Sequence, residues 1–270
     1  GCHDEDGGHI SGKRRTLPKG WFIRMSKLNS LIDYIDTAIN ENRLIFIVVT
    51  SAAQGKIKTK GFSFGEGKSS LAMGIAKRIY GGDEEQVKVN MGYTQEHDED
   101  MMLRNDRTLC WIHDDLQMSY SKSRSYDPEI KEMAGILSAS RPYLAVYIGT
   151  CPHLGMIAHA IRELFMFEIK VPTRGYYEVQ QIKHITPFDD PLNVRTRLDY
   201  MGESAFPKPS ATMEEWYVKW RNFEFKENLM KFRERKRLKR EKPKPIINES
   251  ELSNAGRQLV MARYGKRAVA

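Results

Sequence analysis

The sequence has few cysteines, and they form no recognisable metal or disulfide pattern. Only three of its 270 residues are cysteine. Cys2, Cys110 and Cys151 lie too far apart for the closely spaced pairs of zinc sites. Cys110 and Cys151 stand in apolar runs, where a buried free thiol is usual, so a reducing, cytoplasmic setting is favoured. A metal site at Cys2, His3 and His9 stays an alternative.

Long hydrophobic runs are also missing. A membrane-spanning helix needs about 18 apolar residues. The longest run here, LIFIVV at 44–49, suits a buried strand instead. The first residues, GCHDEDGGHISGKRRT, lack the apolar segment of a secretory signal and are rich in glycine and polar side chains. We therefore expect no membrane span and a disordered tail over 1–25.

Positive charge is confined to one part of the chain. The formal net charge is +8, yet residues 231–244 alone hold nine Lys or Arg against two Glu. Such a run suits the phosphate backbone of DNA, whose binding weakens with salt. A solvated helix, or a tail that binds acidic proteins or lipids, is the alternative. The residues expected to contact DNA are Lys231, Arg233, Arg235, Lys236, Arg237, Lys239 and Arg240.

Between residues 26 and 171 the sequence predicts alternating helices and strands, which indicates an α/β fold. We expect a parallel sheet of about five strands flanked by helices, followed by a C-terminal helical basic extension. The expected strands are 44–50, 87–94, 108–116, 143–150 and 166–171, with a further hairpin strand at 174–185. The expected helices are 26–42, 68–80, 127–141 and 154–164. The expected divisions are a tail over 1–25, a core over 26–200, a long basic helix within 201–245, and a short helix or tail over 246–270.

A glycine-rich loop, GFSFGEGKSS at 61–70, precedes the second expected helix. Its glycines would let backbone amides cradle phosphate oxygens at the start of that helix. Lys68 would reach the β- and γ-phosphates, and the Ser69 hydroxyl would bind Mg²⁺. Phe62 stands where the standard pattern has glycine, so an ordinary glycine-rich turn is the alternative. The expected nucleotide-binding residues are Gly65, Glu66, Gly67, Lys68, Ser69 and Ser70.

A pair of acidic residues ends the apolar run TLCWIHDDL at 108–116. Carboxylates at the end of a buried strand are costly unless they hold a cation or a proton. Asp114 fits a Mg²⁺ ligand, and Asp115 fits the residue that polarises the attacking water. The alternative is a capping pair at a turn.

The motifs GEGKSS and CWIHDDLQ together resemble the P-loop ATPases that carry an additional strand between their two nucleotide motifs. The Asp-Asp pair is similar to that of AAA+ replication initiators and helicase loaders, and to small ATPases of viruses and plasmids. This resemblance implies ATP and Mg²⁺ as ligands. It also implies that Thr150, in LAVYIGTCPH, senses the γ-phosphate. Arg162, in AHAIRELF, or Arg141, in SASRP, would bridge subunits of an oligomer; either could instead be a surface residue.

Two features depart from a standard AAA+ protein. A polar insertion, SAAQGKIKTK at 51–60, separates the first strand from the glycine loop. It could contact a nucleic acid or a subunit, or be a surface excursion. No helical lid is recognisable after residue 171, which favours the compact core of ATPases from mobile elements, encoded by a virus or plasmid.

The sequence thus predicts Mg²⁺-dependent ATP hydrolysis coupled to DNA handling, such as genome packaging or remodelling at an origin, in a homo-oligomer. Two alternatives remain. One is a nucleotide-gated assembly switch that binds a partner through the helix face with Trp216 and Trp220 and hardly turns over ATP. The other is a small-molecule kinase. A GTPase is disfavoured because no Asn-Lys-x-Asp motif follows.

Overall fold

The computed structural model describes residues 21–51, 67–185, 195–206 and 208–241. The chain divides into two compact units, residues 1–211 and residues 212–270, and each is described by itself. Some of the expected segments lie outside the described residues. They are residues 1–20 of the expected tail, the insertion from residue 52 and the segment 246–270, and Cys2, His3 and His9 lie among them.

The first unit is built on a seven-stranded sheet in the order β2-β3-β4-β1-β5-β6-β7. Neighbours among β1 to β5 pair in parallel, which confirms the expected α/β parallel sheet, whereas β5-β6 and β6-β7 pair antiparallel. Because the parallel strands share a direction, their carboxyl ends meet at one edge. The strands are β1 (Ile45–Ser51), β2 (Met91–Gly92), β3 (Thr108–His113), β4 (Leu144–Cys151), β5 (Phe167–Thr173), β6 (Tyr176–Ile185) and β7 (Arg195–Ala205).

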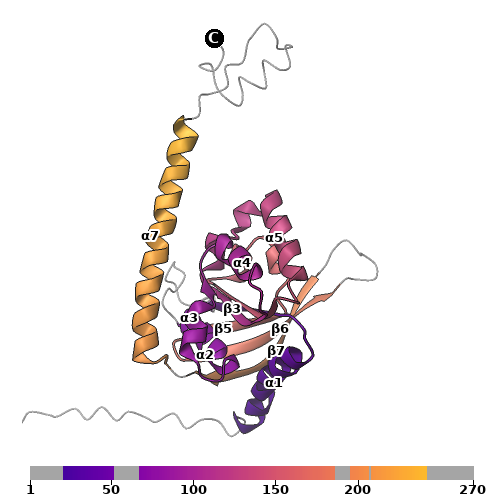
Figure 1. The fold of residues 1–270 in the computed structure, drawn as a ribbon. Coiled ribbons are helices and arrows are strands. Elements are labelled where there is room, and N and C mark those ends of the chain that lie inside the picture. Colours follow the sequence, from indigo (N-terminus) through magenta and orange to yellow (C-terminus); the bar gives the residue numbers. More distant parts are fainter. Residues whose placement is uncertain (1–20, 52–66, 186–194, 207, 242–270) are drawn as a thin grey trace, which may run out of the picture. The chain divides into compact units, whose positions relative to one another are not determined.

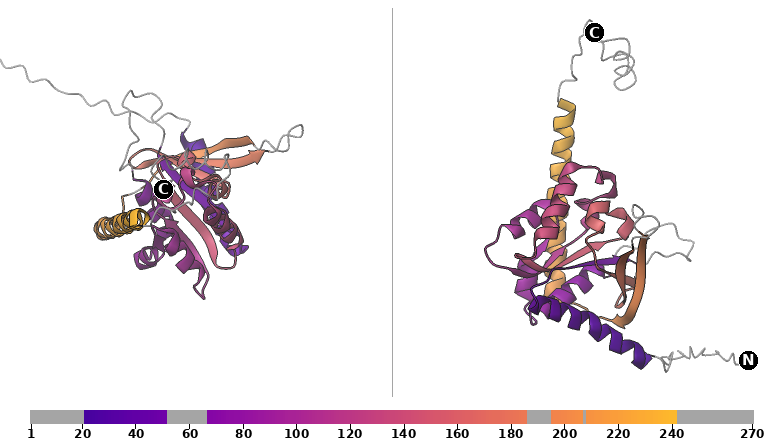
Figure 2. Two further views of the ribbon diagram at one scale, coloured as in Figure 1. Left: turned by 90° about the horizontal axis from the view of Figure 1, so that it is seen from above. Right: turned by 90° about the vertical axis from the view of Figure 1, so that its right-hand side faces the viewer.

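Helices cover both faces of this sheet (Figures 1 and 2). Every residue of β1 and β4 is buried, as expected for central strands between two helical layers. On one face Tyr34 of α1 packs edge-on against Phe167, with ring centroids 5.3 Å apart. The helices of the unit are α1 (Trp21–Asn40), α2 (Lys68–Ile79), α3 (Glu84–Val89), α4 (Gln95–Met102), α5 (Pro128–Ala139) and α6 (His159–Arg162), with 3-10 turns η1 (Leu116–Met118), η2 (Lys122–Arg124) and η3 (Leu154–Met156).

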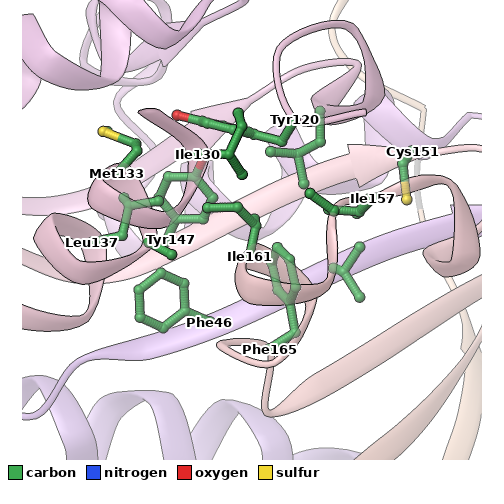
Figure 3. Close-up of a cluster of buried hydrophobic side chains, with 14 of the residues drawn as sticks. Phe46, Tyr120, Ile130, Met133, Leu137, Tyr147, Cys151, Ile157, Ile161 and Phe165 are labelled. Carbon is green, nitrogen blue, oxygen red and sulfur yellow. The ribbon is translucent and has the colours of Figure 1, made fainter. Parts of the chain in front are cut away.

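The opposite face carries an aromatic-rich core under α5 and α6 (Figure 3). Phe46 of β1 and Tyr147 of β4 lie with ring centroids 5.4 Å apart, and Phe165 stands edge-on to Phe46. Burial of this apolar area is the main term that stabilises the unit. Cys151 belongs to the same core, and Cys110 is buried as well; both are free thiols, as the sequence predicts.

Two regions differ in type from the sequence-based expectation. The expected strand over 87–94 was wrong for most of its length, because Asp83 caps α3 by accepting from the amides of Glu85 and Gln86. Only Met91–Gly92 remains a strand. The expected strands ended at residue 185, yet Arg195–Ala205 forms β7, which pairs with β6 along its length. The sequence of β7 does not alternate clearly between apolar and polar residues, so no local pattern indicated this strand.

Helix α1 begins at Trp21, inside the expected tail, and the long helix begins at Ala211, because residues 201–205 belong to β7. This helix, α7 (Ala211–Glu241), is continuous and confirms the expected helical extension. Within it Lys219 donates to Glu215 at 2.6 Å, and the rings of Trp216 and Trp220 stack with centroids 5.7 Å apart. Among the described residues, no helix combines the length and apolar character required to cross a bilayer.

We expect Gly149→Ala to destabilise the protein. Gly149 lies in β4, and a Cβ there would stand 2.0 Å from Leu116 Cδ1, inside the buried core. Overpacking of this kind costs about 1–3 kcal/mol of unfolding free energy, which urea titration measures. The control is Gly135→Ala on the exposed side of α5, where a Cβ meets nothing within 4 Å. That change should stabilise by about 0.5–1 kcal/mol. Equal stability of the two variants would contradict the close packing at Gly149.

Candidate nucleotide site

The start of α2 has the backbone of a phosphate-binding turn. Gly67 caps this helix in the left-handed conformation, with φ at +92°. Glycine suits this position because other residues are strained there. A Cβ at Gly67 would also lie 3.2 Å from Cζ of Phe206, so the chain that follows β7 approaches the loop. Gly65 and Glu66 lie outside the described residues.

Lys68 is the first residue of α2 and is buried. Its Nζ donates a 2.9 Å hydrogen bond to the Ser51 hydroxyl at the end of β1. The ammonium therefore lies at the carboxyl edge of the sheet, beside a helix N-terminus whose free amides favour anions. Ser70, two residues further along α2, is half-buried.

Three elements meet at the carboxylate of Asp114. The Ser69 hydroxyl donates to Asp114 Oδ1 at 2.6 Å, and the Thr150 hydroxyl donates to the same oxygen at 2.7 Å. Asp114 and Thr150 are fully buried. The structure thus brings together the loop serine, the strand acid and the fourth-strand threonine that the sequence singled out.

Asp115 follows in an unusual conformation, with φ at +54°. A non-glycine residue in this region stores about 1–3 kcal/mol of strain, and such strain clusters at functional sites. The backbone N–H of Asp115 donates to the Thr150 hydroxyl at 3.0 Å. Thr150 therefore links the two acids, since it accepts from one and donates to the other.

The donor set fits Mg²⁺. This ion prefers hard oxygen ligands and is held by few protein groups together with phosphates. Ser69 Oγ and Asp114 Oδ1 are such oxygens and lie 2.6 Å apart. Ser69 directly follows Lys68 in α2. Both residues predicted as metal ligands are therefore placed together.

Two residues near the site were not predicted. Ser51 holds Lys68, as described above. Glu168 of β5 is buried next to β1 and accepts a 2.8 Å hydrogen bond from the Thr50 hydroxyl, while Lys170 lies 3.7 Å from its carboxylate. An acid inside the apolar strand FEIKV was a signal that could have found Glu168.

A second buried acid supports β3 from the other side. Asp98 of α4 is fully buried. Four side chains donate to its carboxylate, at 2.6 to 2.9 Å. They are Trp111 and His113 of β3, Tyr120 and Tyr147. His113 directly precedes Asp114, so this network holds the end of the strand that carries the site. The sequence showed no pattern that joins α4 to these donors.

Both tyrosines of the network stay protonated. Burial, and after it the negative charge of Asp98, raise the pKa of the Tyr120 and Tyr147 hydroxyls well above the usual range. The His113 Nδ1 lies 2.8 Å from the same carboxylate and donates to it in the tautomer that carries the proton on Nδ1. Asp98 therefore receives four hydrogen bonds, enough to compensate its burial.

The two candidate arginines lie at opposite edges of the sheet. Arg162 ends α6, which follows β4 at the carboxyl edge. Arg141 precedes the start of β4, and its Nε donates to the Asn42 carbonyl at 2.6 Å. The structure thus does not bring Arg141 near Asp114 of its own chain, whereas Arg162 lies at the edge that holds the site. A role across subunits stays a prediction for both.

In the second unit the seven residues expected to contact DNA lie on α7. Lys231, Arg233, Lys236 and Arg237 are exposed on this helix. Arg235, Lys239 and Arg240 belong to the same helix, and their side chains lie outside the described part. Contact with DNA stays a prediction for all seven.

The sheet order and the site define the class of the fold. Strand β4 lies between β1, which leads into the glycine loop, and β3, which carries Asp114 and Asp115. The predicted additional strand therefore separates the two nucleotide motifs in space. Together with the convergence of Lys68, Ser69 and Asp114, this is the fold of a P-loop NTPase of the additional-strand class.

No family model and no curated protein matches the chain. Solved structures with a similar arrangement include the N-terminal domain of zonular occludens toxin from Neisseria meningitidis. It is 11% identical, with a TM-score of 0.35, and the match covers 62% of this chain and 95% of that one. The genome packaging NTPase B204 of Sulfolobus turreted icosahedral virus 2 is 9% identical, with a TM-score of 0.33, and the match covers 62% and 98%. Similarity at this level does not extend to activity or partners.

We expect Asp98→Asn to unfold more easily than the wild type. An amide cannot accept all four hydrogen bonds, and breaking a buried charged network costs about 3 kcal/mol. The matched control is Asp100→Asn, an exposed acid two residues along α4, with a change within about 0.5 kcal/mol. Urea unfolding followed by circular dichroism compares them. If Asp98→Asn matched the control, the carboxylate would not be what holds β3 to α4.

Proposed function

We propose that the protein is a Mg²⁺-dependent ATPase that couples hydrolysis to DNA handling and acts as a homo-oligomer. The observation that carries the proposal is the Asp114 carboxylate, which Ser69 and Thr150 reach at 2.6 and 2.7 Å from α2 and β4. This arrangement has little structural use of its own, because a buried acid between two hydroxyls is costly to maintain.

Each residue would act through its position. The amide of Gly67 and the Lys68 ammonium would bind the β- and γ-phosphates at the start of α2. Ser69 and Asp114 would hold Mg²⁺, which would supply positive charge at these phosphates. Lys68 would exchange its Ser51 contact for a phosphate oxygen.

Asp115 would orient the attacking water. Its backbone is fixed at the end of β3 by the N–H bond to Thr150, so a change at the γ-phosphate that moves Thr150 would also move Asp115. An arginine of a neighbouring subunit would stabilise the charge that develops in the transition state, and Arg162 is the better placed candidate because it lies at the carboxyl edge.

The basic run over 231–244, which begins on α7, supports DNA as the partner. Its nine Lys and Arg, against two Glu, would neutralise phosphates without reading sequence. A nucleotide-gated assembly switch, which would bind a partner through the helix face with Trp216 and Trp220, is a second candidate, because these two rings stack on α7 and stay partly exposed.

Steady-state ATP hydrolysis, measured with and without double-stranded DNA across a salt series, tests this proposal. We expect DNA to stimulate turnover at low salt and to lose this effect as salt rises. Lys68→Ala should lower kcat at least about 100-fold, because it removes a charge that stabilises the transition state.

The other outcomes separate the alternatives. Turnover that ignores DNA and requires a small acceptor would indicate a kinase. Tight ATP binding with a change of oligomeric state and hardly any turnover would indicate the assembly switch. A wild type that neither binds nor hydrolyses nucleotide would contradict the assignment of the loop.

A further inference from the structure

A cavity lies at the carboxyl edge of the sheet, and the candidate subunit-bridging arginine, Arg162, is among the residues that line it. Its volume is about 430 Å³. Residues of η2, of the turn before α5, of α5 and of α6 line it. The side chains that matter below are those of Lys122, Ser125, Tyr126, Lys131, His159 and Arg162.

The residues that line the cavity include three cations, Lys122, Lys131 and Arg162, and no carboxylate. Within the described part of the chain, the side chains of these three residues form no hydrogen bond or ion pair. Outside the lining, Asp127 and Glu129 contact Arg124, at 2.8 and 3.1 Å, rather than these three cations.

Glu163, next to Arg162 in the sequence, lies 3.5 Å from the ring of His159. The lining of the cavity thus carries charge of one sign, and a cleft lined by positive charge attracts anions.

An aromatic ring stands at the same place. Tyr126 lines the cavity and is 90% exposed, although a side chain of this size usually packs. The phosphodiester chain of a nucleic acid offers both an anionic backbone and flat bases, and proteins that bind it combine a basic groove with aromatic rings. A free anion such as phosphate would use the lysines and leave the ring without a role.

Both walls of the cavity begin at the nucleotide site. The segment with Lys122 and Tyr126 follows Asp115, and the segment with His159 and Arg162 follows Thr150. These segments are joined, because the Ala158 N–H donates to the Tyr120 carbonyl at 2.8 Å and Ser121 forms a β-bridge with Ile157.

The His159 N–H adds a third link, a 3.4 Å hydrogen bond to the Ser125 hydroxyl. The two walls are therefore tied to each other, and each continues the chain from Asp115 or Thr150.

We propose that this cavity binds the phosphodiester backbone of a nucleic acid strand, with Lys122 and Lys131 at the phosphates and Tyr126 stacked on a base. The proposal rests on the DNA-coupled function above and deepens it. The ATPase core holds the strand directly, at a place whose walls follow Asp115 and Thr150 in the chain, and the basic arm adds a second contact.

The test is the affinity of the full chain for a fluorescently labelled oligonucleotide, measured by anisotropy across a salt series without nucleotide. The variant is Lys122→Gln with Lys131→Gln. Its control is Lys77→Gln with Lys88→Gln, which removes the same charge from lysines paired with Glu84 and Glu85.

We expect the cavity variant to bind about tenfold more weakly and its log K against log salt slope to fall by about two, because two phosphate contacts are lost. The control should keep the wild-type slope. The basic arm is the same in every protein compared, so a difference in affinity or slope between the cavity variant and its control measures the contribution of the cavity.

Tyr126→Ala should weaken binding with an unchanged slope, because stacking releases no counterions. Basal ATP hydrolysis should not change.

Equal slopes and affinities for the cavity variant and its control would overturn the proposal while leaving the ATPase assignment intact. Intact oligonucleotide binding with reduced DNA-free hydrolysis would also overturn it, and would assign the cavity to the phosphates of a nucleotide on a neighbouring subunit. Loss of hydrolysis in the wild type itself would contradict the proposed ATPase, yet the slopes would still decide whether the cavity binds nucleic acid.

Discussion

The carboxylate of Asp114 is the constraint on which the site depends. It lies fully buried at the end of β3, and hydroxyls from α2 and β4 converge on one of its oxygens at 2.6 and 2.7 Å. A buried carboxylate is tolerated only where donors or a cation compensate it. The start of α2, β4 and the end of β3 must therefore keep their relative positions, and Thr150 can reach the carboxylate because β4 lies next to β3.

A second buried carboxylate secures the same strand from the opposite face. Asp98 binds Trp111 and His113 of β3 and the hydroxyls of Tyr120 and Tyr147. Alternate residues of a strand point to opposite faces, so His113 anchors β3 to α4 while Asp114 meets α2. Two polar networks, one at His113 and one at Asp114, therefore fix the end of β3. Fully paired polar networks of this kind specify a single arrangement of the core rather than adding much net stability.

The sequence predicted the elements whose signals are local. LIFIVV and GEGKSS carry their pattern within ten residues, and Lys68, Ser69, Asp114 and Thr150 converge as predicted. It could not predict β7, which depends on pairing with β6, or the Asp98 network, whose members lie 13 to 49 residues apart. Helix α3 replaced an expected strand because one cap at Asp83 outweighed the apolar pattern.

The Mg²⁺ dependence of ATP affinity tests the central claim most directly, since it asks whether Ser69 and Asp114 form a metal-nucleotide site. A fluorescent ATP analogue would be titrated into the wild type and Ser69→Ala, with and without Mg²⁺. We expect Mg²⁺ to strengthen the binding of the analogue to the wild type at least about tenfold, and Ser69→Ala to lose this increase in affinity. The same gain in both proteins, or none in the wild type, would contradict it.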